Sequence, residues 1–245
     1  MKTNFAIAAL ISAAAVLTPA HATTVLFTAT TTLPAAGNYG SSTTGLALTL
    51  SDNAGSIEAY GYKNLFPTTP TLPATATPPV FSGASETGLV VQNDLSGTRG
   101  LGVNDATNQD KGFIAPTDAV VLDFSGVNNP ATYNSQTGYI SSVTFKLYED
   151  YSGADYEIYG VTGSYGKAGA TYTVIQSGQM SNSTPLTVST SSLYSSYVIG
   201  VTDCALDIQS ISLNYSPAPE PGTFVMAGIA LIGLGVTLKK RSRKA

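Results

Sequence analysis

The sequence predicts an all-β protein: a two-sheet β-sandwich of jelly-roll-like type, with an N-terminal signal peptide and a single C-terminal transmembrane helix. Three observations predict this class. Apolar and polar residues alternate over short segments in the middle of the chain, as they do in strands that bury one face. Turn-forming residues separate these segments, and no segment before the tail keeps a capped helical period. Two apolar runs, one near each terminus, lie outside this pattern.

The first 22 residues have the parts of a secretory signal peptide. Lys2 supplies the positive charge, and an apolar run follows over residues 5–17. Ala20 and Ala22 give the small-x-small pattern that signal peptidase accepts, so we expect cleavage after Ala22. A retained anchor helix is the alternative, but the run is shorter than the ~20 residues that span a bilayer.

Cleavage after Ala22 would remove His21, the single histidine of the chain. The mature protein would then begin at Thr23 without the imidazole that Ser-His-Asp and Cys-His catalysis require. Cys204 is the single cysteine, so no disulfide can form within one chain. In an oxidising compartment a lone thiol is either buried or paired between chains, and we expect burial.

Residues 23–216 form one predicted extracellular domain of short strands. The alternation is clearest over residues 142–147 and 210–215, where every second side chain is apolar. Leu206 and Ile208 have the opposite parity to the second of these segments, which predicts a β-bulge near Gln209 and Ser210. The predicted strands are 24–32, 44–50, 56–62, 87–92, 119–125, 142–147, 155–161, 170–177, 185–190, 195–202 and 206–215.

Residues 67–79 contain five of the 13 prolines, among Thr and Ala. This composition predicts an exposed, polyproline-like loop. A linker is the alternative, but it would leave residues 23–66 as a module too small to fold alone without a disulfide or a metal. We therefore expect a long loop within one sandwich.

The predicted domain is acidic, with five basic side chains against 14 carboxylates and so a net charge of −9. The remaining six Lys and Arg residues lie in the two terminal segments. Because a nucleic-acid-binding surface needs clustered cations to neutralise phosphates, nucleic acid is not an expected partner.

The C-terminal tail, residues 217–245, has three parts in series. Pro219, Glu220 and Pro221 follow the last predicted strand, and residues 223–238 then carry no charge. As a helix this stretch would be about 24 Å long and would nearly span a ~30 Å hydrocarbon core. A basic cluster at the end would hold the terminus in the cytoplasm and leave the domain outside. The cluster consists of Lys239, Lys240, Arg241, Arg243 and Lys244.

This order of Pro-Glu-Pro, a short Gly- and Ala-containing apolar run and a basic end resembles the PEP-CTERM sorting signal. That family consists of bacterial surface proteins with a signal peptide, in Gram-negative bacteria that make exopolysaccharide. The resemblance implies that Pro219, Glu220 and Pro221 are recognised as a substrate by exosortase, a membrane cysteine protease-transpeptidase. It also implies association with the membrane and display at the cell surface or in the extracellular matrix. Residues 100–103, Gly-Leu-Gly-Val before a stretch rich in Asn and Asp, are similar to a segment common in the same family and carry no implied activity.

One loop has the residues for a cation site. Asn104, Asp105, Asn108 and Asp110 supply carboxylate and amide oxygens, the ligands that Ca²⁺ takes. The EF-hand spacing fails, because Ala106 would occupy its first position. A solvated turn between strands is the alternative, since Asn and Asp are ordinary turn formers. Apart from calcium at this loop, no cofactor is expected.

Residues 149–157 form the densest acidic segment, with four carboxylates around a Ser-Gly turn. They could form a second cation site, or a carboxylate pair for glycoside hydrolysis in which Glu149 or Glu157 is essential. The simpler interpretation is a polar hairpin loop that keeps an exported protein soluble. Glutamates are sparse in the domain, so we expect no enzymatic activity and assign no catalytic residue.

All 14 tyrosines lie in the predicted domain, which contains no tryptophan. Tyrosine rings can stack on sugars, although tyrosine is also simply a good strand residue. The candidates for a glycan-binding face are Tyr133, Tyr139, Tyr148, Tyr151, Tyr156 and Tyr159.

These observations favour an exported, non-catalytic surface protein that is a structural or adhesive component of the exopolysaccharide matrix. The alternative is a carbohydrate-binding module, with or without calcium. A carboxylate glycosidase is the third hypothesis.

Overall fold

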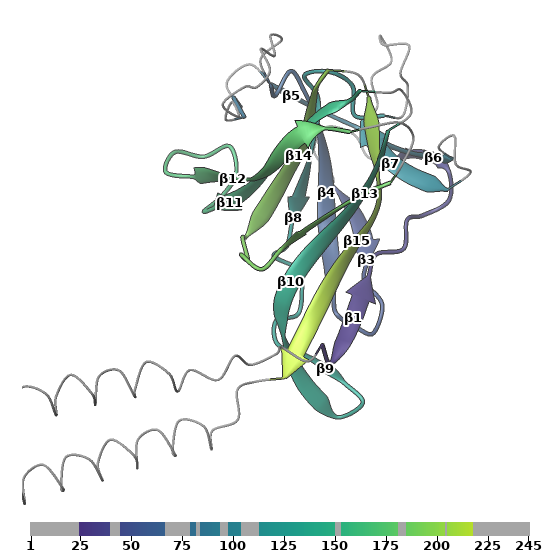
Figure 1. The fold of residues 1–245 in the computed structure, drawn as a ribbon, viewed down its shortest axis with the longest axis vertical. Helices are drawn as coiled ribbons and strands as arrows, with labels where there is room; N and C mark the ends of the chain where they lie inside the picture. The colour runs from purple at the N-terminus through teal and green to yellow at the C-terminus, as the bar shows by residue number, and fades with distance from the viewer. Residues whose placement is uncertain are drawn as a thin grey trace, which may run out of the picture.

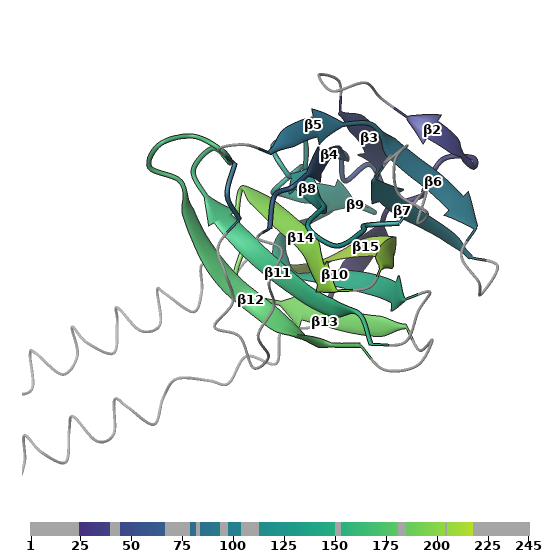
Figure 2. The same cartoon turned by 90° about the horizontal axis from the view of Figure 1, so that it is seen from above.

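The computed structural model describes residues 25–39, 45–66, 79–81, 84–93, 98–103, 113–149, 153–180, 185–203 and 205–217. These residues form two antiparallel sheets and contain no helix. The sheets pack face to face, with the long strands of both running along the molecule (Figures 1 and 2). The all-β prediction is therefore confirmed for the described residues, while jelly-roll connectivity stays a prediction.

The first sheet has the strand order β13-β10-β15-β7-β6-β2. Two more strands join it from the side, β1 on β15 and β9 on β10. Its longest ladder pairs β10 with β15. The bounds are β1 Phe27–Thr30, β2 Gly37–Tyr39, β6 Leu89–Asn93, β7 Arg99–Val103, β9 Ala131–Tyr133, β10 Gln136–Glu149, β13 Leu186–Thr190 and β15 Leu206–Pro217.

The second sheet has the order β12-β11-β14-β8-β4-β3, and β5 pairs with β4. Its central strands are apolar on both faces, as the continuous runs Ala-Val-Val-Leu in β8 and Tyr-Val-Ile-Gly-Val in β14 require. The bounds are β3 Leu46–Thr49, β4 Ser56–Lys63, β5 Ser85–Thr87, β8 Ala119–Asp123, β11 Asp155–Thr162, β12 Thr171–Gln179 and β14 Ser196–Asp203.

The main core lies between the two sheets. Phe145 and Leu213 of the first sheet are buried in the same cluster as Leu122, Ile158 and Tyr197 of the second. Every second residue of these strands faces this core, which is the alternation that the sequence shows. Burial of these side chains is the main favourable contribution to folding.

A second, smaller core covers the outer face of the second sheet. Leu65 and Phe66, just after β4, pack there against Tyr159 and Val198. Backbone hydrogen bonds fix this covering segment: the Leu65 amide donates to the Thr117 carbonyl at 2.7 Å, and the Val80 amide to the Leu65 carbonyl at 2.8 Å. The outer face therefore has its own apolar layer, and this layer supports the site described below.

The two sides of the sandwich differ. On one side the chain joins the sheets after β1, where the Thr32 amide donates to the Thr49 carbonyl at 3.2 Å and the Ser51 amide to the Thr30 carbonyl at 3.1 Å. On the other side β12 and β13 are the last strands of their sheets. On this second side, no described strand lies beyond β12 or β13.

Most predicted strands are confirmed, but one prediction needs correction and three strands were not predicted. Residues 87–92 were expected to form one strand, but the chain changes sheets there: β5 pairs with β4, and β6 with β7. Three strands, β2, β7 and β9, had no predicted counterpart. The predicted bulge is confirmed, because Lys146 pairs with Ser210 and Leu147 with Ile208, which leaves Gln209 as the extra residue.

Several predictions lie outside the described residues: the signal peptide, Cys204, most of the 67–79 loop, and the helix at 223–238. Among the residues that are described, none belongs to a helix long and apolar enough to cross a membrane. The division of the chain into domains stays a prediction.

Candidate functional site: an aromatic pocket

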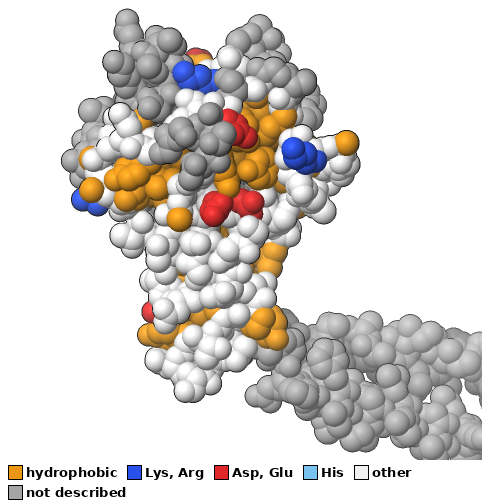
Figure 3. Space-filling model, turned by 180° about the vertical axis from the view of Figure 1, so that it is seen from behind, with side chains coloured by type: hydrophobic (Ala, Val, Ile, Leu, Met, Phe, Trp, Pro, Cys, Tyr) orange, Lys and Arg blue, Asp and Glu red, His pale blue; other side chains and the backbone are white. Residues whose placement is uncertain are grey.

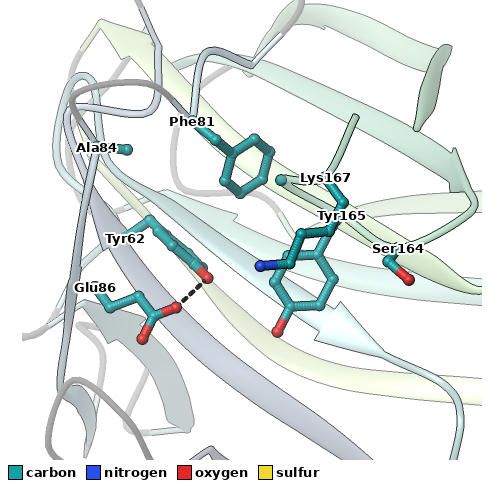
Figure 4. Close-up of a pocket in the computed structure, with 8 residues that line it drawn as sticks. Tyr62, Phe81, Ala84, Glu86, Ser164, Tyr165 and Lys167 are labelled. Carbon is teal, nitrogen blue, oxygen red and sulfur yellow. Dashed lines mark hydrogen bonds between the residues drawn. The ribbon is translucent and has the colours of Figure 1, made fainter. Parts of the chain in front are cut away.

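The outer face of the second sheet carries an open pocket of about 680 Å³. It lies between β4 and β5 on one side and the turn that joins β11 to β12 on the other (Figure 4). The lining residues are Tyr62, Phe81, Ala84, Glu86, Ser164, Tyr165, Gly166 and Lys167.

Three aromatic rings form the apolar part of the pocket. Tyr62 comes from β4, Phe81 from the segment before β5, and Tyr165 from the β11–β12 turn. Phe81 meets Tyr62 edge-on with ring centroids 5.4 Å apart, and Tyr165 meets Tyr62 in the same way at 6.3 Å. Tyr62 is buried, whereas Phe81 and Tyr165 are half-buried, so the latter two rings present surface to a ligand.

Strand alternation and a glycine-rich turn explain this arrangement. Glu58, Tyr60 and Tyr62 are alternate residues of β4 and so point to the same outer face. Gly166 has a φ of +69°, which a side chain tolerates poorly, and a Cβ there would press on the Phe81 ring at 3.1 Å. The Gly166 amide donates to the Tyr172 hydroxyl at 2.9 Å, which anchors the turn to β12.

Polar groups surround the rings. The Tyr62 hydroxyl donates to the Glu86 carboxylate at 2.7 Å (Figure 4). Burial, and then this hydrogen bond, raise the pKa of Tyr62 well above its ordinary value, so the hydroxyl stays protonated at neutral pH. On the opposite wall, the Lys167 side chain reaches into the pocket between Phe81 and Tyr165, and Ser164 lies at its margin (Figure 4).

A second tyrosine–carboxylate pair lies beside the pocket. The Tyr60 hydroxyl donates to the Glu58 carboxylate at 2.5 Å, and the Tyr60 ring lies 5.9 Å from that of Tyr165. The hydrogen bond to Glu58, and then burial, raise the pKa of Tyr60. Together the site offers flat apolar rings, a carboxylate, a hydroxyl and an amine. This is the combination that fits a ring-shaped ligand with many hydroxyls.

None of the tyrosines that the sequence offered for a glycan-binding face lines the aromatic pocket. Tyr148, Tyr156 and Tyr159 are buried, so for these three the prediction is wrong. Tyr133 and Tyr139 are 36% and 45% exposed, but they lie on β9 and β10 of the other sheet. Tyr151 lies outside the described residues.

The pocket was not predicted from the sequence, because its residues lie far apart in the chain and two of its three aromatic rings come from loops. One signal was present. Residues 163–169, Gly-Ser-Tyr-Gly-Lys-Ala-Gly, place an aromatic ring and a cation in a glycine-rich turn, where no strand role explains them.

The acidic segment does not form an exposed carboxylate pair in its described part. Glu157 is buried and accepts a hydrogen bond from the Tyr159 hydroxyl at 2.8 Å. Asp155 is also buried, and burial followed by the nearby Asp203 raises the pKa of its carboxyl. The side chain of Glu149 lies outside the described residues.

The predicted calcium ligands, Asn104, Asp105, Asn108 and Asp110, are likewise outside the described residues. The part of the chain that is described holds no cluster of three or more Asp, Glu, His or Cys side chains that could bind a metal. The calcium site therefore stays a prediction, which melting temperatures measured in calcium and in chelator would test.

Comparison with known proteins identifies the tail. Residues 217–241 match the family model described as the PEP-CTERM protein-sorting motif. This range includes Pro219, Glu220 and Pro221, the predicted apolar run and the first three cations. No curated protein and no solved structure matches the chain. The PEP-CTERM prediction is confirmed, and the motif implies export, processing by exosortase, and a cell-surface or membrane location.

Proposed function

We propose that this chain is a non-catalytic surface protein that binds a polysaccharide of the extracellular matrix through the aromatic pocket. The pocket is the observation that carries the proposal. Phe81 and Tyr165 present ring surface, and Glu86, Ser164 and Lys167 supply acceptors and donors around it. A sugar ring has apolar C–H faces and an equatorial rim of hydroxyls, so it matches such a lining.

The position of the pocket suits display from a membrane or surface anchor. The sorting motif begins at the end of β15, which lies at one end of the domain, while β5 lies near the opposite end (Figure 1). A protein held by its tail would therefore direct the pocket away from the anchor. Signal peptidase at Ala20–Ala22 and exosortase at the Pro-Glu-Pro sequence would be its processing enzymes in a Gram-negative host.

The absence of catalysis is part of the proposal. Glycoside hydrolysis in most families needs two carboxylates on either side of the bond that is cut. Among the described residues that line the pocket, Glu86 is the only carboxylate, and it accepts the Tyr62 hydroxyl. This arrangement favours binding over cleavage.

The first test is a binding measurement on the full chain in mild detergent, with purified neutral and acidic oligosaccharides that include fragments of the host exopolysaccharide. We expect saturable binding of at least one of them without release of reducing ends. Tyr165→Ala removes one stacking face and should weaken binding about tenfold or more. Lys167→Ala, at an exposed position, should weaken binding without lowering the melting temperature.

Tyr139→Ala is the matched control, because Tyr139 is an exposed tyrosine outside the pocket. We expect it to bind as the wild type does. Loss of binding in Tyr139→Ala together with normal binding in Tyr165→Ala would move the site to the β9–β10 surface. Absence of binding to every sugar would favour a purely structural or adhesive role, for which the sorting motif is the supporting observation.

A further inference from the structure

The end of the domain from which the tail leaves carries most of the exposed apolar side chains. Six large hydrophobic residues are exposed in the described part of the chain, and two of them, Val80 and Val174, lie elsewhere. The other four lie at the end where β15 meets the sorting motif: Val25, Tyr133, Tyr139 and Leu193.

The β9–β10 hairpin places the two tyrosines. Tyr139 lies opposite Ser216, the residue before the end of β15. The hairpin continues beyond β15: β9 and β10 pair as far as Tyr133 and Gln136, whereas β15 ends opposite Gly138. Figure 1 shows β9 at the lower end of the domain, beside the end of β15. Both tyrosines therefore lie where the chain enters the tail, or past that level.

Val25 and Leu193 lie beside the hairpin. Val25 comes directly before Leu26, whose amide donates to the Tyr215 carbonyl at 2.6 Å. Leu193, in the loop from β13 to β14, lines a small hollow of about 160 Å³ together with Ile140, which pairs with Tyr215. The four exposed side chains therefore lie around the start of β10 and the end of β15.

This end of the domain has few charges. The four residues lie in segments of sequence that contain none: 23–51, 124–145 and 168–202. Two carboxylates lie toward the same end, Asp52 in the β3–β4 turn and Asp123 at the end of β8, and both are half-buried. They accept hydrogen bonds from the Ser51 hydroxyl at 2.9 Å and the Ser125 amide at 2.8 Å, respectively. Low charge permits contact with an apolar partner, because little desolvation of ions is required, but it does not select the partner.

The tail gives the reason to expect a lipid surface. The sorting motif implies a membrane location, and its predicted apolar run begins at Thr223. Six residue steps separate Pro217 from Thr223, so this connection reaches at most about 20 Å when fully extended. The headgroup layer takes up part of that distance, since it adds roughly 5–8 Å on each side of the hydrocarbon core. While the tail is attached, this end of the domain is therefore held close to the lipid headgroups.

We propose that this end of the domain rests on the membrane, with its four exposed apolar side chains in the headgroup layer of the bilayer. Tyrosine suits this layer, because its ring is apolar while its hydroxyl stays hydrated. The contact orients the domain, which a short tether alone does not do, and directs the end that carries β5 away from the membrane (Figure 1). The inference depends on anchoring by the tail and does not depend on sugar binding by the pocket.

The test uses the full chain reconstituted in phosphatidylcholine vesicles, with or without bromine on the upper part of the acyl chains. The chain contains no tryptophan, so Tyr139→Trp and Leu193→Trp each supply a single fluorophore, which bromine quenches only at close range. We expect bromolipid to lower the fluorescence of both variants about twofold or more. Val80→Trp is the matched control: Val80 is 48% exposed, lies beyond the end of β4 at the opposite end of the domain, and should be quenched little.

Phe224→Trp, in the predicted apolar run, reports separately on insertion of the tail. Quenching of Phe224→Trp without quenching of Tyr139→Trp and Leu193→Trp would overturn the inference while leaving the anchor in place. Absence of quenching in all three would remove the anchor and the inference together. Equal quenching of Val80→Trp would show that the domain has no fixed orientation on the membrane, and would also exclude the proposal.

A second set of variants separates contact from proximity. Val25→Glu and Leu193→Glu, added together to the Tyr139→Trp chain, place carboxylates beside the fluorophore and should reduce its quenching about twofold, because a charge resists entry into the bilayer. Val80→Glu in the same chain is the control and should leave the quenching unchanged. Unchanged quenching in the double variant would mean that the tether alone holds this end near the lipid, against the proposed contact. Sugar binding in detergent should be the same in all these chains, so the two proposals can fail independently.

Discussion

At the residue scale, the second core depends on the absence of one side chain. Gly200 in β14 lies beneath the Phe66 ring, and a Cβ at this position would collide with that ring. Phe66 in turn stacks on Tyr159 with ring centroids 5.9 Å apart. Glycine is therefore required here by close approach of a ring.

Gly200→Ala should lower the free energy of unfolding by about 1–3 kcal/mol, because overpacking displaces Phe66 from the outer face. Denaturant unfolding monitored by circular dichroism measures the loss. Gly178→Ala in β12 is the control: its Cβ would have no contact closer than 3.6 Å, so the change should be within about 0.5 kcal/mol. Equal effects at the two glycines would contradict this account of the outer core.

At the element scale, the β11–β12 turn carries the pocket without holding the hairpin together. Thr162 pairs with Thr171, so the ladder closes directly before and after residues 163–170. Replacing these eight residues with Asn-Gly, a favoured two-residue hairpin turn, should keep the sheet. It removes the Tyr165 ring, Ser164 and Lys167, and we expect sugar binding to be lost with a stability loss of about 1–3 kcal/mol. Undiminished binding to the shortened chain would place the site elsewhere.

Some strands could be predicted from the sequence, whereas others and the change of sheet between β5 and β6 could not. Strands that bury alternate or continuous apolar residues, such as β10 and β14, were predictable from periodicity. β7 was not, because its sequence Arg-Gly-Leu-Gly-Val carries two glycines and only a weak strand preference. The change of sheet between β5 and β6 depends on which distant strands pair with each of them. Such non-local pairing cannot be recognised from the hydrophobic pattern of a few consecutive residues.

The aromatic pocket was not predicted from the sequence. The number of tyrosines raised a glycan-binding face as an alternative, but three of the six residues named for it are buried. Tyr156 and Tyr159 lie three residues apart in β11 and so point to opposite faces of the sheet, which places them in the two different cores. Tyr62 and Tyr165 meet only because β4 and the β11–β12 turn lie on the same outer face. Periodicity locates a face within a strand, but not the loop that covers it.

At the scale of the whole molecule, the low charge and the abundance of tyrosine together determine how stability depends on pH. Figure 3 shows a surface on which uncharged side chains predominate and charged ones are scattered. Since isolated charges of this kind contribute little to stability, the fold depends on buried rings and strand pairing. Many of those rings carry a hydroxyl, and this makes folding sensitive to alkali.

The pKa of several tyrosines is raised in the folded protein, mainly by burial. Burial raises the pKa of Tyr197 and of Tyr215 each to about 12. The pKa of Tyr62 and Tyr159 is also raised by burial, and further by their hydrogen bonds to Glu86 and Glu157. An unfolded chain ionises its tyrosines near pH 10. The stability that these groups contribute is therefore fully present below about pH 10 and is lost as the pH rises through the folded-state values.

We expect the melting temperature to change little on this account between about pH 7 and pH 9 and to fall steeply above about pH 10. The check is a parallel titration in which phenolate absorbance follows ionisation and circular dichroism follows the sheets. The buried tyrosines should ionise together with the loss of sheet signal, because ionisation of a buried phenol requires the core to open.

Tyr215→Phe keeps the ring stacked on Phe27, 4.5 Å between centroids, and removes one titrating group. The unfolding free energy of this variant should fall less steeply above about pH 10, because unfolding then releases close to one proton fewer. Ionisation of all tyrosines near pH 10 with the sheets intact would show that the rings are accessible to water, against the packing described for both cores.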